Sequence, residues 1–313
     1  MRLGDDARRS VVFFGTRNPG HDGAPVLFRG TGFIIGHKEE NITFIYLVTA
    51  AHVAKALSVS GEFVTRVNMK EGSAYEELCR DVRWYFHEDS SVDVAIAEYM
   101  PPEGHDCVYF SSANFLTKER RESKKIGAGD LIQIVGLFRL LAGTKRNLPI
   151  VHTGHLALVP EEGERIPQKN QDGDVLEVEG YLVEAQTLQG LSGSPVFVRR
   201  TLAVLPAPGT DTGLQPKGYG AVFLLGLYSG AWDGEPGEIL SADRTSRGTL
   251  RVPVGMGIAV PAPKITEVIN CAALREARRL GIEVDRQEAA IKDAPAAVTR
   301  APQPAAEAGT LPD

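Results

Sequence analysis

The sequence predicts an all-β protein of two antiparallel six-stranded β-barrels followed by a C-terminal helix. Two series of short runs rich in Val, Ile, Phe and Tyr carry this prediction, and Gly, Pro, Asn and Asp separate the runs. No amphipathic helical pattern interrupts either series, and closure into barrels leaves no exposed strand edge. The runs are VVFFGT, PVLFRGTGFIIG, TFIYLVTA, GEFVTRVNM, VRWYF and DVAIAEY, then DLIQIVGLF, IVHTGHLALV, EVEGYLVEA, SPVFVRR, GAVFLLGLYSG and GMGIAVP.

Composition sets the boundaries between these parts. A mixed-charge stretch, TKERRESKKI, has no apolar periodicity and predicts a solvated linker between the barrels. After the last strand, helical spacing of apolar side chains predicts one helix that Gly281 stops. The remainder is rich in Ala and Pro and lacks large apolar groups, which predicts disorder. The expected parts are a first barrel in residues 1–116, a linker in 117–126, a second barrel in 127–262, a helix in 263–285 and a tail in 286–313.

Charge and apolar content limit the classes of partner. The 313 residues are 43% apolar and carry a formal net charge of -6, which gives no electrostatic reason to expect nucleic acid or an anionic membrane. No apolar stretch is long enough to span a bilayer, and charges fill the first nine residues, where an export signal needs an apolar run. We therefore expect a cytoplasmic protein.

The cysteines and paired histidines do not form a metal-binding pattern. Cys79, Cys107 and Cys271 are scattered and odd in number, which favours reduced thiols over a disulfide framework. His152 and His155 in VHTGH lie close enough to share a metal, but no third ligand has suitable spacing. The sequence predicts no metal and no organic cofactor.

Three segments carry the residue types that acyl transfer by a serine requires. That chemistry needs a hydroxyl on a tight turn, a base to accept its proton, and a buried carboxylate to orient the base. In LVTAAHV, small residues before His52 leave its imidazole room to turn. In VDVAIA, Asp93 begins an apolar strand, where a carboxylate needs a hydrogen-bond partner. GLSGSPVF contains two serines, Ser192 and Ser194, among glycines and a proline that favour a tight turn.

Together these segments resemble the trypsin-like (chymotrypsin-fold) serine peptidases, and more closely the bacterial branch that includes the HtrA proteases. TAAH at 49–52, DVA at 93–95 and GLSGSP at 190–195 match the family motifs in the family's order. The resemblance covers most of residues 10–270 and implies an active site between the two barrels. We expect no PDZ domain of the HtrA type. Supporting matches are GTGF at 30–33, GLYSG at 226–230 and GMGIAVP at 255–261.

The resemblance assigns roles to individual residues. It implies Ser192 as nucleophile, His52 as base and Asp93 as the group that orients His52. It implies an oxyanion hole formed by the backbone N–H groups of Gly190 and Ser192, with Ser194 packed beneath the loop. It also implies a specificity pocket without a carboxylate, and therefore an uncharged residue before the cut, apolar or polar; the alternative is that Asp233 and the loop at 234–249 reach into the pocket. The expected pocket residues are Gln186 at the base and Ser229, Gly230, Ala231, Gly257 and Ala259 in the walls.

Activation is expected to differ from that of secreted relatives. In those proteins a new N-terminal ammonium pairs with an aspartate just before the nucleophile, and here that position is Leu191. We therefore expect no maturation by cleavage. Apolar packing of Leu191, or a protein partner that orders the loops at 156–180 and 233–250, would have to order the oxyanion loop instead.

Other interpretations stay open at the level of sequence. Asp89 is an alternative carboxylate for His52, while His87 lies outside the family motif. A catalytically silent module that binds a protein through the same cleft is the alternative to an enzyme. A third hypothesis keeps the enzyme and gives it one dedicated protein partner in a bacterial defence or signalling pathway. Under the enzyme hypotheses the substrate is a protein or peptide.

Overall fold

The computed structural model divides the chain into two compact units, residues 1–271 and 272–313, and the first contains the strands. In the part of the chain that the structure describes, no helix is both long and apolar enough to cross a membrane. The described residues are 5–17, 25–169, 175–186, 188–200, 203–206, 214–217, 222–234 and 252–293.

The N-terminal half of the first unit is an eight-stranded sheet in the order β5-β4-β1-β2-β3-β7-β6, with β8 beside β2. Its long strands are rich in Val, Ile and Phe, which suits strands whose central residues are buried. Phe13, Phe33 and Ile34 are fully buried in its core. The strands are β1 (Val11–Thr16), β2 (Leu27–Glu39), β3 (Ile42–Thr49), β4 (Glu62–Asn68), β5 (Ala74–Arg80), β6 (Tyr85–Phe86), β7 (Ala95–Glu98) and β8 (Phe110–Ser111).

This sheet does not close into the first barrel that the sequence predicted. Among the described strands, the terminal strands β5 and β6 pair on one side only. The chain turns at Asp81, which has a φ of 53°, and β6 is only two residues long. Trp84 packs between these strands against the rings of Phe14 and Phe63. The turn at Asp81 and the buried indole of Trp84 therefore separate β5 from β6 along the chain.

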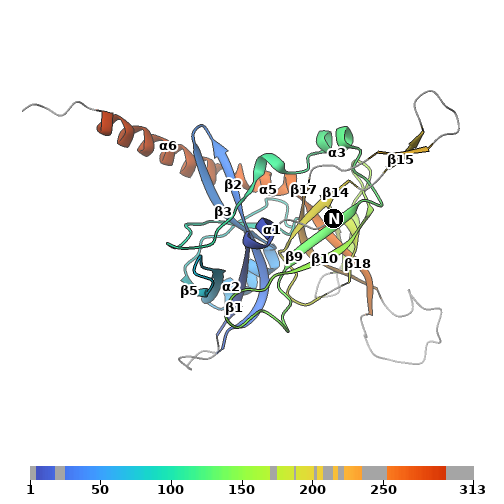
Figure 1. Cartoon of the computed structure of the whole chain (residues 1–313), viewed down its shortest axis with the longest axis horizontal. Helices are drawn as coiled ribbons and strands as arrows, with labels where there is room; N and C mark the ends of the chain where they lie inside the picture. The colour runs from blue at the N-terminus through green and yellow to red at the C-terminus, as the bar shows by residue number, and fades with distance from the viewer. Residues whose placement is uncertain are drawn as a thin grey trace, which may run out of the picture. The chain divides into compact units, whose positions relative to one another are not determined.

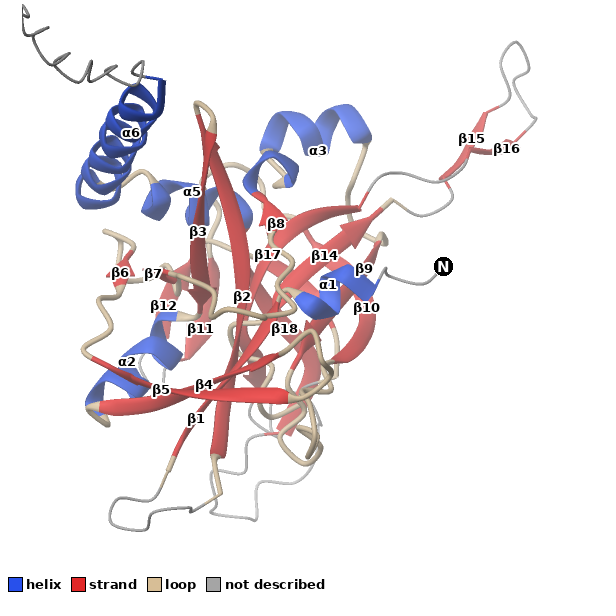
Figure 2. Ribbon diagram, turned by 60° about the vertical axis from the view of Figure 1, so that its left-hand side comes forward, coloured by secondary structure: helices blue, strands red, loops and turns tan. Residues whose placement is uncertain are grey.

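The C-terminal half forms the closed six-stranded barrel that the sequence predicted, in the order β10-β13-β18-β17-β14-β9. Apolar side chains such as Ile132, Val183 and Leu225 fill its interior. Strand β9 of the barrel contacts β1 of the N-terminal sheet (Figures 1 and 2). The barrel strands are β9 (Leu131–Gly136), β10 (Ile150–Leu158), β13 (Tyr181–Glu184), β14 (Pro195–Arg199), β17 (Val222–Gly234) and β18 (Val252–Pro261).

Two hairpins and several helices complete the described chain. Of these, helix α2 begins directly after β3 and was not predicted from the sequence. The hairpins are β11 (Ile166–Lys169) with β12 (Val175–Val178), and β15 (Ala203–Pro206) with β16 (Leu214–Lys217). The helices are α1 (Asp5–Arg9), α2 (Ala51–Val59), η1 (Ser112–Asn114), α3 (Lys118–Lys124), α5 (Ala262–Ile269) and α6 (Ala272–Asp293).

The expected linker at 117–126 is largely helical. Thr117 caps the first turn of α3, because its Oγ1 accepts a hydrogen bond from the Arg120 N–H at 3.3 Å. Lys125 ends the helix in the left-handed conformation. Local capping therefore gives this charged run a structure that apolar periodicity did not predict.

The C-terminal helix of 263–285 was also predicted wrongly in its bounds. The chain forms two helices, α5 and α6, which are separated at Asn270 and Cys271. Gly281 lies inside α6, which continues to Asp293 and so into the expected disordered tail. A glycine costs a helix only about 1 kcal/mol relative to alanine. Ion pairs of Arg279 with Glu276 and Glu283 support the turns on either side.

Candidate active site

His52 lies in the first turn of α2, immediately after β3. The small residues before it are buried, and Thr49 at the end of β3 donates a hydrogen bond from Oγ1 to the carbonyl oxygen of Thr31 at 2.7 Å. This bond fixes the end of β3 against β2. The His52 side chain itself is 45% exposed, so its ring has solvent access on one side.

The carboxylate of Asp93 bonds both the ring and the backbone N–H of His52. His52 Nδ1 lies 2.8 Å from Asp93 Oδ2, and the His52 backbone N–H donates to Oδ1 at 2.9 Å. Ser229, in the middle of β17, donates a third hydrogen bond, from Oγ to Oδ2 at 2.6 Å. Because a carboxylate can only accept, Nδ1 carries a proton and Nε2 is left with a lone pair.

These contacts shift the pKa values of both groups. Burial lowers the pKa of His52, but the hydrogen bond and negative charge of Asp93 outweigh that effect and raise the pKa above its usual value. Burial raises the pKa of Asp93, and the bonds from His52 and Ser229 together with the His52 charge outweigh it and hold the pKa below its usual value. The pair is therefore a carboxylate next to a basic imidazole.

The loop that carries Ser192 packs directly against β2 and the end of β3. The carbonyl oxygen of Ser192 accepts a hydrogen bond from the Thr31 N–H at 3.0 Å. Gly193 has a φ of +84°, and a Cβ there would lie 2.1 Å from the Thr31 carbonyl oxygen and 2.3 Å from Thr49 Oγ1. Only glycine fits this approach, which brings Ser192 beside the segment that ends in His52.

The Ser192 hydroxyl itself makes no hydrogen bond within the described part of the chain, to His52 or to any other residue. The structure thus joins His52 to Asp93 and brings the Ser192 loop next to them, without a hydrogen bond from the hydroxyl to the ring. Catalytic hydrogen bonds of this kind are often long in ligand-free enzymes and tighten with substrate.

The predicted oxyanion-hole residues, Gly190 and Ser192, lie in the loop that precedes β14. The backbone N–H groups of Gly190 and Ser192 donate no hydrogen bond to any described residue. Gly190 has a φ of +103°, and a Cβ there would lie 2.9 Å from the Leu137 carbonyl oxygen. Its own carbonyl oxygen accepts a bond from Thr31 Oγ1 at 2.6 Å.

Leu191 and Ser194 lie where the sequence predicted them. Leu191 is fully buried in the barrel core, so its apolar packing anchors the loop between Gly190 and Ser192. Ser194 is also fully buried, with its Oγ close to Gly136, where a Cβ would approach it to 1.9 Å. One of the two serines is thus beneath the loop and the other is partly accessible.

The predicted specificity pocket stays a prediction. Gly230 and Ala231 lie on β17 opposite Ile258 and Gly257 of β18. The ring of Tyr228 packs on Gly257, since a Cβ there would lie 2.5 Å from Tyr228 Cε2. Gln186 is exposed, Ala259 is buried in the barrel core, and Ser229 donates a hydrogen bond to Asp93. The loop from residue 235 to 251 lies outside the described residues.

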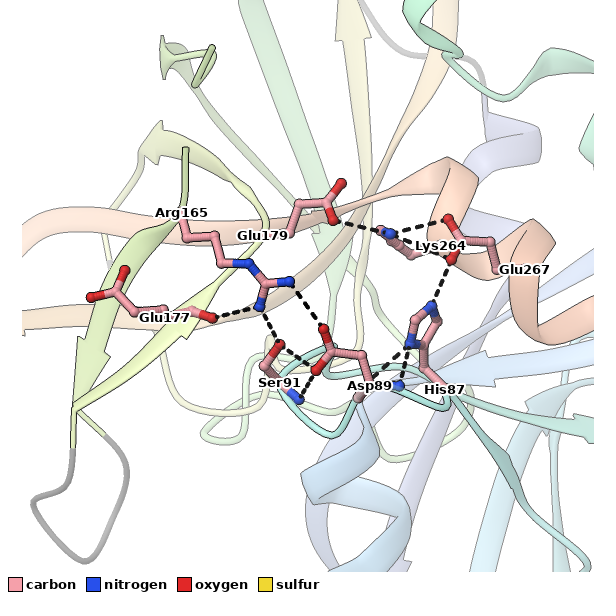
Figure 3. Close-up of polar contacts among 8 residues, drawn as sticks. All are labelled: His87, Asp89, Ser91, Arg165, Glu177, Glu179, Lys264 and Glu267. Atoms are coloured by element: carbon pink, nitrogen blue, oxygen red, sulfur yellow. Dashed lines mark hydrogen bonds and ion pairs between the residues drawn. The ribbon is translucent and has the colours of Figure 1, made fainter. Parts of the chain in front are cut away.

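Asp89 is not a partner of His52 in the described structure. It accepts hydrogen bonds from the backbone N–H and the hydroxyl of Ser91, and these bonds together with Arg165 lower its pKa to about 2. His87 accepts a bond from the Asp89 N–H at Nδ1 and lies 2.8 Å from Glu267 through Nε2 (Figure 3). This cluster ties the turn before Asp93 to α5 and to the β11–β12 hairpin.

The paired histidines do not form a metal site among the described residues. His155 Nδ1 lies 3.6 Å from Glu184 Oε2, and no group of three candidate ligands occurs in that part of the chain. Sequence reasoning missed Thr31 as the residue that joins β2 to the nucleophile loop, although it lies in the GTGF motif. It also missed Ser229 as a partner of Asp93.

Comparison with known proteins finds similar solved structures only. No family model and no curated protein matches the sequence. Solved structures of serine proteases resemble the chain at low identity. Deg5 shares 14% identity over 84% of this chain and 88% of its own, with a TM-score of 0.43. The serine endoprotease from Yersinia pestis shares 14% over 88% and 69%, with a TM-score of 0.43. The active form of a protease from M. tuberculosis shares 17% over 84% and 80%, with a TM-score of 0.38.

Proposed function

We propose that the chain is a trypsin-like serine endopeptidase in which Ser192 is the nucleophile, His52 the general base and Asp93 the residue that orients His52. The contact between His52 and Asp93 carries the proposal, because one carboxylate accepts from both Nδ1 and the backbone N–H of the same histidine. A base needs an unprotonated Nε2, which this contact supplies. The packing of Gly193 on Thr49 supports Ser192 as its partner.

The reaction in this proposal passes through an acyl-enzyme. Ser192 Oγ gives its proton to His52 Nε2 and bonds to the carbonyl carbon of the peptide, while the N–H groups of Gly190 and Ser192 hold the negative oxygen. His52 then gives that proton to the leaving amine as the C–N bond breaks, which leaves an ester on Ser192. Water then loses a proton to His52 and bonds to the ester carbon; the ester C–O bond breaks, the acid product leaves, and His52 returns the proton to Ser192 Oγ.

The substrate in this proposal carries an uncharged residue before the cut. The residues predicted to form the pocket, which are Gln186, Ser229, Gly230, Ala231, Gly257 and Ala259, include no carboxylate. A Lys or Arg side chain there would lose water without a counter-charge, which costs at least a few kcal/mol. A peptide library should therefore show cleavage after uncharged residues, and dominant cleavage after Lys or Arg would contradict the proposal.

The natural substrate is a dedicated protein partner in this proposal, cut in a bacterial defence or signalling pathway. Mapping of new protein N-termini in cells with the wild-type chain or with Ser192→Ala identifies it. We expect few fragments that depend on Ser192, and broad degradation of many proteins would contradict a dedicated role.

Hydrolysis of a peptide or unfolded protein by purified variants tests the proposed reaction. Ser192→Ala should abolish hydrolysis, because it removes the nucleophile. Ser194→Gly is the matched control, because Ser194 is buried beneath the loop and its hydroxyl does not enter the reaction. Equal loss of activity in both variants would contradict the choice of Ser192. No hydrolysis by the wild-type chain on any substrate would favour the alternative, a catalytically silent protein-binding module.

A further inference from the structure

The loop at residues 137–149, between β9 and β10, reaches from the barrel to the N-terminal sheet, where Arg66 of β4 holds it. Arg66 is 4% exposed, and its two Nη atoms donate hydrogen bonds to the carbonyl oxygens of Gly143 and Thr144, each at 2.7 Å. One planar guanidinium thus bonds two successive peptide groups, which fixes their orientation as well as their position.

Two neighbours on the sheet, Glu76 and Phe28, orient the guanidinium of Arg66 toward the loop. Glu76 of β5 lies 3.4 Å from Arg66 Nε, and the ring of Phe28 lies 5.5 Å below the guanidinium. Burial lowers the pKa of Arg66, and the Glu76 charge opposes that shift. The sheet supplies the counter-charge, so the Nη atoms are left to the loop carbonyls.

Two asparagines add a second connection between the same loop and β4. The Asn147 N–H donates to Asn68 Oδ1 at 2.7 Å, and Asn147 Nδ2 donates to the Arg66 carbonyl oxygen at 2.6 Å. Asn68 Nδ2 returns a bond to the Asn147 carbonyl oxygen at 3.2 Å. We call Arg66, Asn68 and Asn147 the clamp. It joins the far end of the loop to the sheet through side chains that are buried or nearly so.

The near end of the same loop contacts the oxyanion-hole segment. The Arg139 N–H donates to the Gln189 carbonyl oxygen at 3.2 Å, and Arg139 Nη1 donates to Gln189 Oε1 at 3.1 Å. The Leu137 N–H donates to Thr31 Oγ1 at 3.0 Å, and that hydroxyl donates to the Gly190 carbonyl oxygen. The loop therefore holds Gln189 by direct hydrogen bonds and Gly190 through the hydroxyl of Thr31.

We propose that Arg66 is a positioning residue for the oxyanion hole, and that it acts through the loop at 137–149 to hold Gly190 in its left-handed conformation. This inference rests on the proposed peptidase function. In this conformation the Gly190 N–H has no partner among the described residues and can meet a negative oxygen. Leu191 has no charge with which to pair an activating ammonium. In this proposal the N-terminal sheet stabilises the Gly190 segment instead, through Arg66 and the loop at 137–149.

Amide hydrogen exchange tests whether the clamp stabilises the oxyanion-hole segment, and it does not depend on enzymatic activity. In full-length Arg66→Met, amides of residues 137–149 and 188–194 should both exchange faster, by about tenfold, because the second segment loses the support of the first. Arg80→Met is the matched control, since Arg80 is an exposed arginine on β5 whose one ion pair among the described residues is with Glu62 at the surface. It should leave both segments unchanged. Faster exchange confined to residues 137–149 would overturn the proposal.

Kinetics on a peptide substrate separates positioning from stability. With the concentration of active sites set by fluorophosphonate titration, Arg66→Met should lower kcat about tenfold and change KM by less than about twofold, because the oxyanion donors act in the transition state. A purely structural role would lower the unfolding temperature and leave kcat per labelled site unchanged, and that result would overturn the proposal. Arg66→Lys should recover only part of the loss, because one ammonium lacks the planar fork.

A second variant keeps the test decisive if Arg66→Met does not fold. Gly143 has a φ of +92°, and a Cβ there would lie 2.1 Å from the Arg146 carbonyl oxygen, so Gly143→Ala distorts the loop and leaves Arg66 intact. It should reproduce faster exchange at 188–194, and unchanged exchange there would overturn the proposal. If the wild-type chain neither labels nor hydrolyses, the proposed function fails, while the exchange comparison still decides whether the clamp supports residues 188–194.

Discussion

Asp93 accepts hydrogen bonds from two groups of His52 and from Ser229, so its replacement tests the orientation of the histidine. Asp93→Asn should leave the fold intact and lower kcat by about 10⁴, the order known for this exchange in a Ser-His-Asp enzyme, because an amide favours the wrong imidazole tautomer. The measurement is steady-state hydrolysis of a peptide. Asp89→Asn is the control, because Asp89 lies four residues away and bonds Ser91 and Arg165 instead of His52; its kcat should stay close to that of the wild type. A large loss of kcat in Asp89→Asn and a small one in Asp93→Asn would assign the role to Asp89.

The raised pKa of His52 predicts the acid side of the pH profile. His52 acts as a base only when neutral, so activity appears as pH rises through its pKa. Because Asp93 holds that pKa above its usual value, the midpoint of kcat/KM should lie above about 6.5. In Asp93→Asn the residual activity should have a lower midpoint, since burial then acts without the carboxylate. A wild-type midpoint below 6.5 would contradict the described pair.

At the scale of elements, the nucleophile loop depends on the close approach of Gly193 to β2 and β3. Gly193→Ala adds a Cβ within 2.1 Å of the Thr31 carbonyl oxygen, so it should destabilise the fold by more than about 3 kcal/mol or displace Ser192. Gly61→Ala is the matched control, because Gly61 has a φ of +72° with open space around it; it should cost only about 1–2 kcal/mol. Denaturant unfolding compares the two, and equal costs would contradict the packing role of Gly193.

The sequence predicted most strands, and it failed where charge or capping overrides apolar periodicity. Strand β5 was missed because AYEELCR carries exposed charges on an edge strand, and α3 was interpreted as a linker because its Thr117 cap is a local signal. Helix α2 was missed because it is short. The order of the motifs was enough to pair His52 with Asp93. The roles of Thr31 and Ser229 depend on how distant strands pack, which no local pattern shows.

At the scale of the whole molecule, the described N-terminal segment is hydrogen-bonded to the N-terminal half of the fold. Arg9 of α1 donates a hydrogen bond from Nε to Asp106 at 2.8 Å, and the Ser10 carbonyl oxygen accepts from the Ile34 N–H. Leu191 is buried and offers no charge to a new terminal ammonium. We therefore expect the intact chain, confirmed by mass, to hydrolyse a peptide as fast as a form trimmed near residue 10. Activity in the trimmed form alone would show that cleavage activates the protein.

The most direct test of the central claim is the site at which a fluorophosphonate attaches. The probe needs a serine activated by a neighbouring base, and tandem mass spectrometry of the labelled chain locates the adduct. We predict one adduct, on Ser192, that is absent from Ser192→Ala, retained in Ser194→Gly and strongly slowed in His52→Ala. An adduct on another serine, or none on the folded wild-type chain under any condition, would contradict the account.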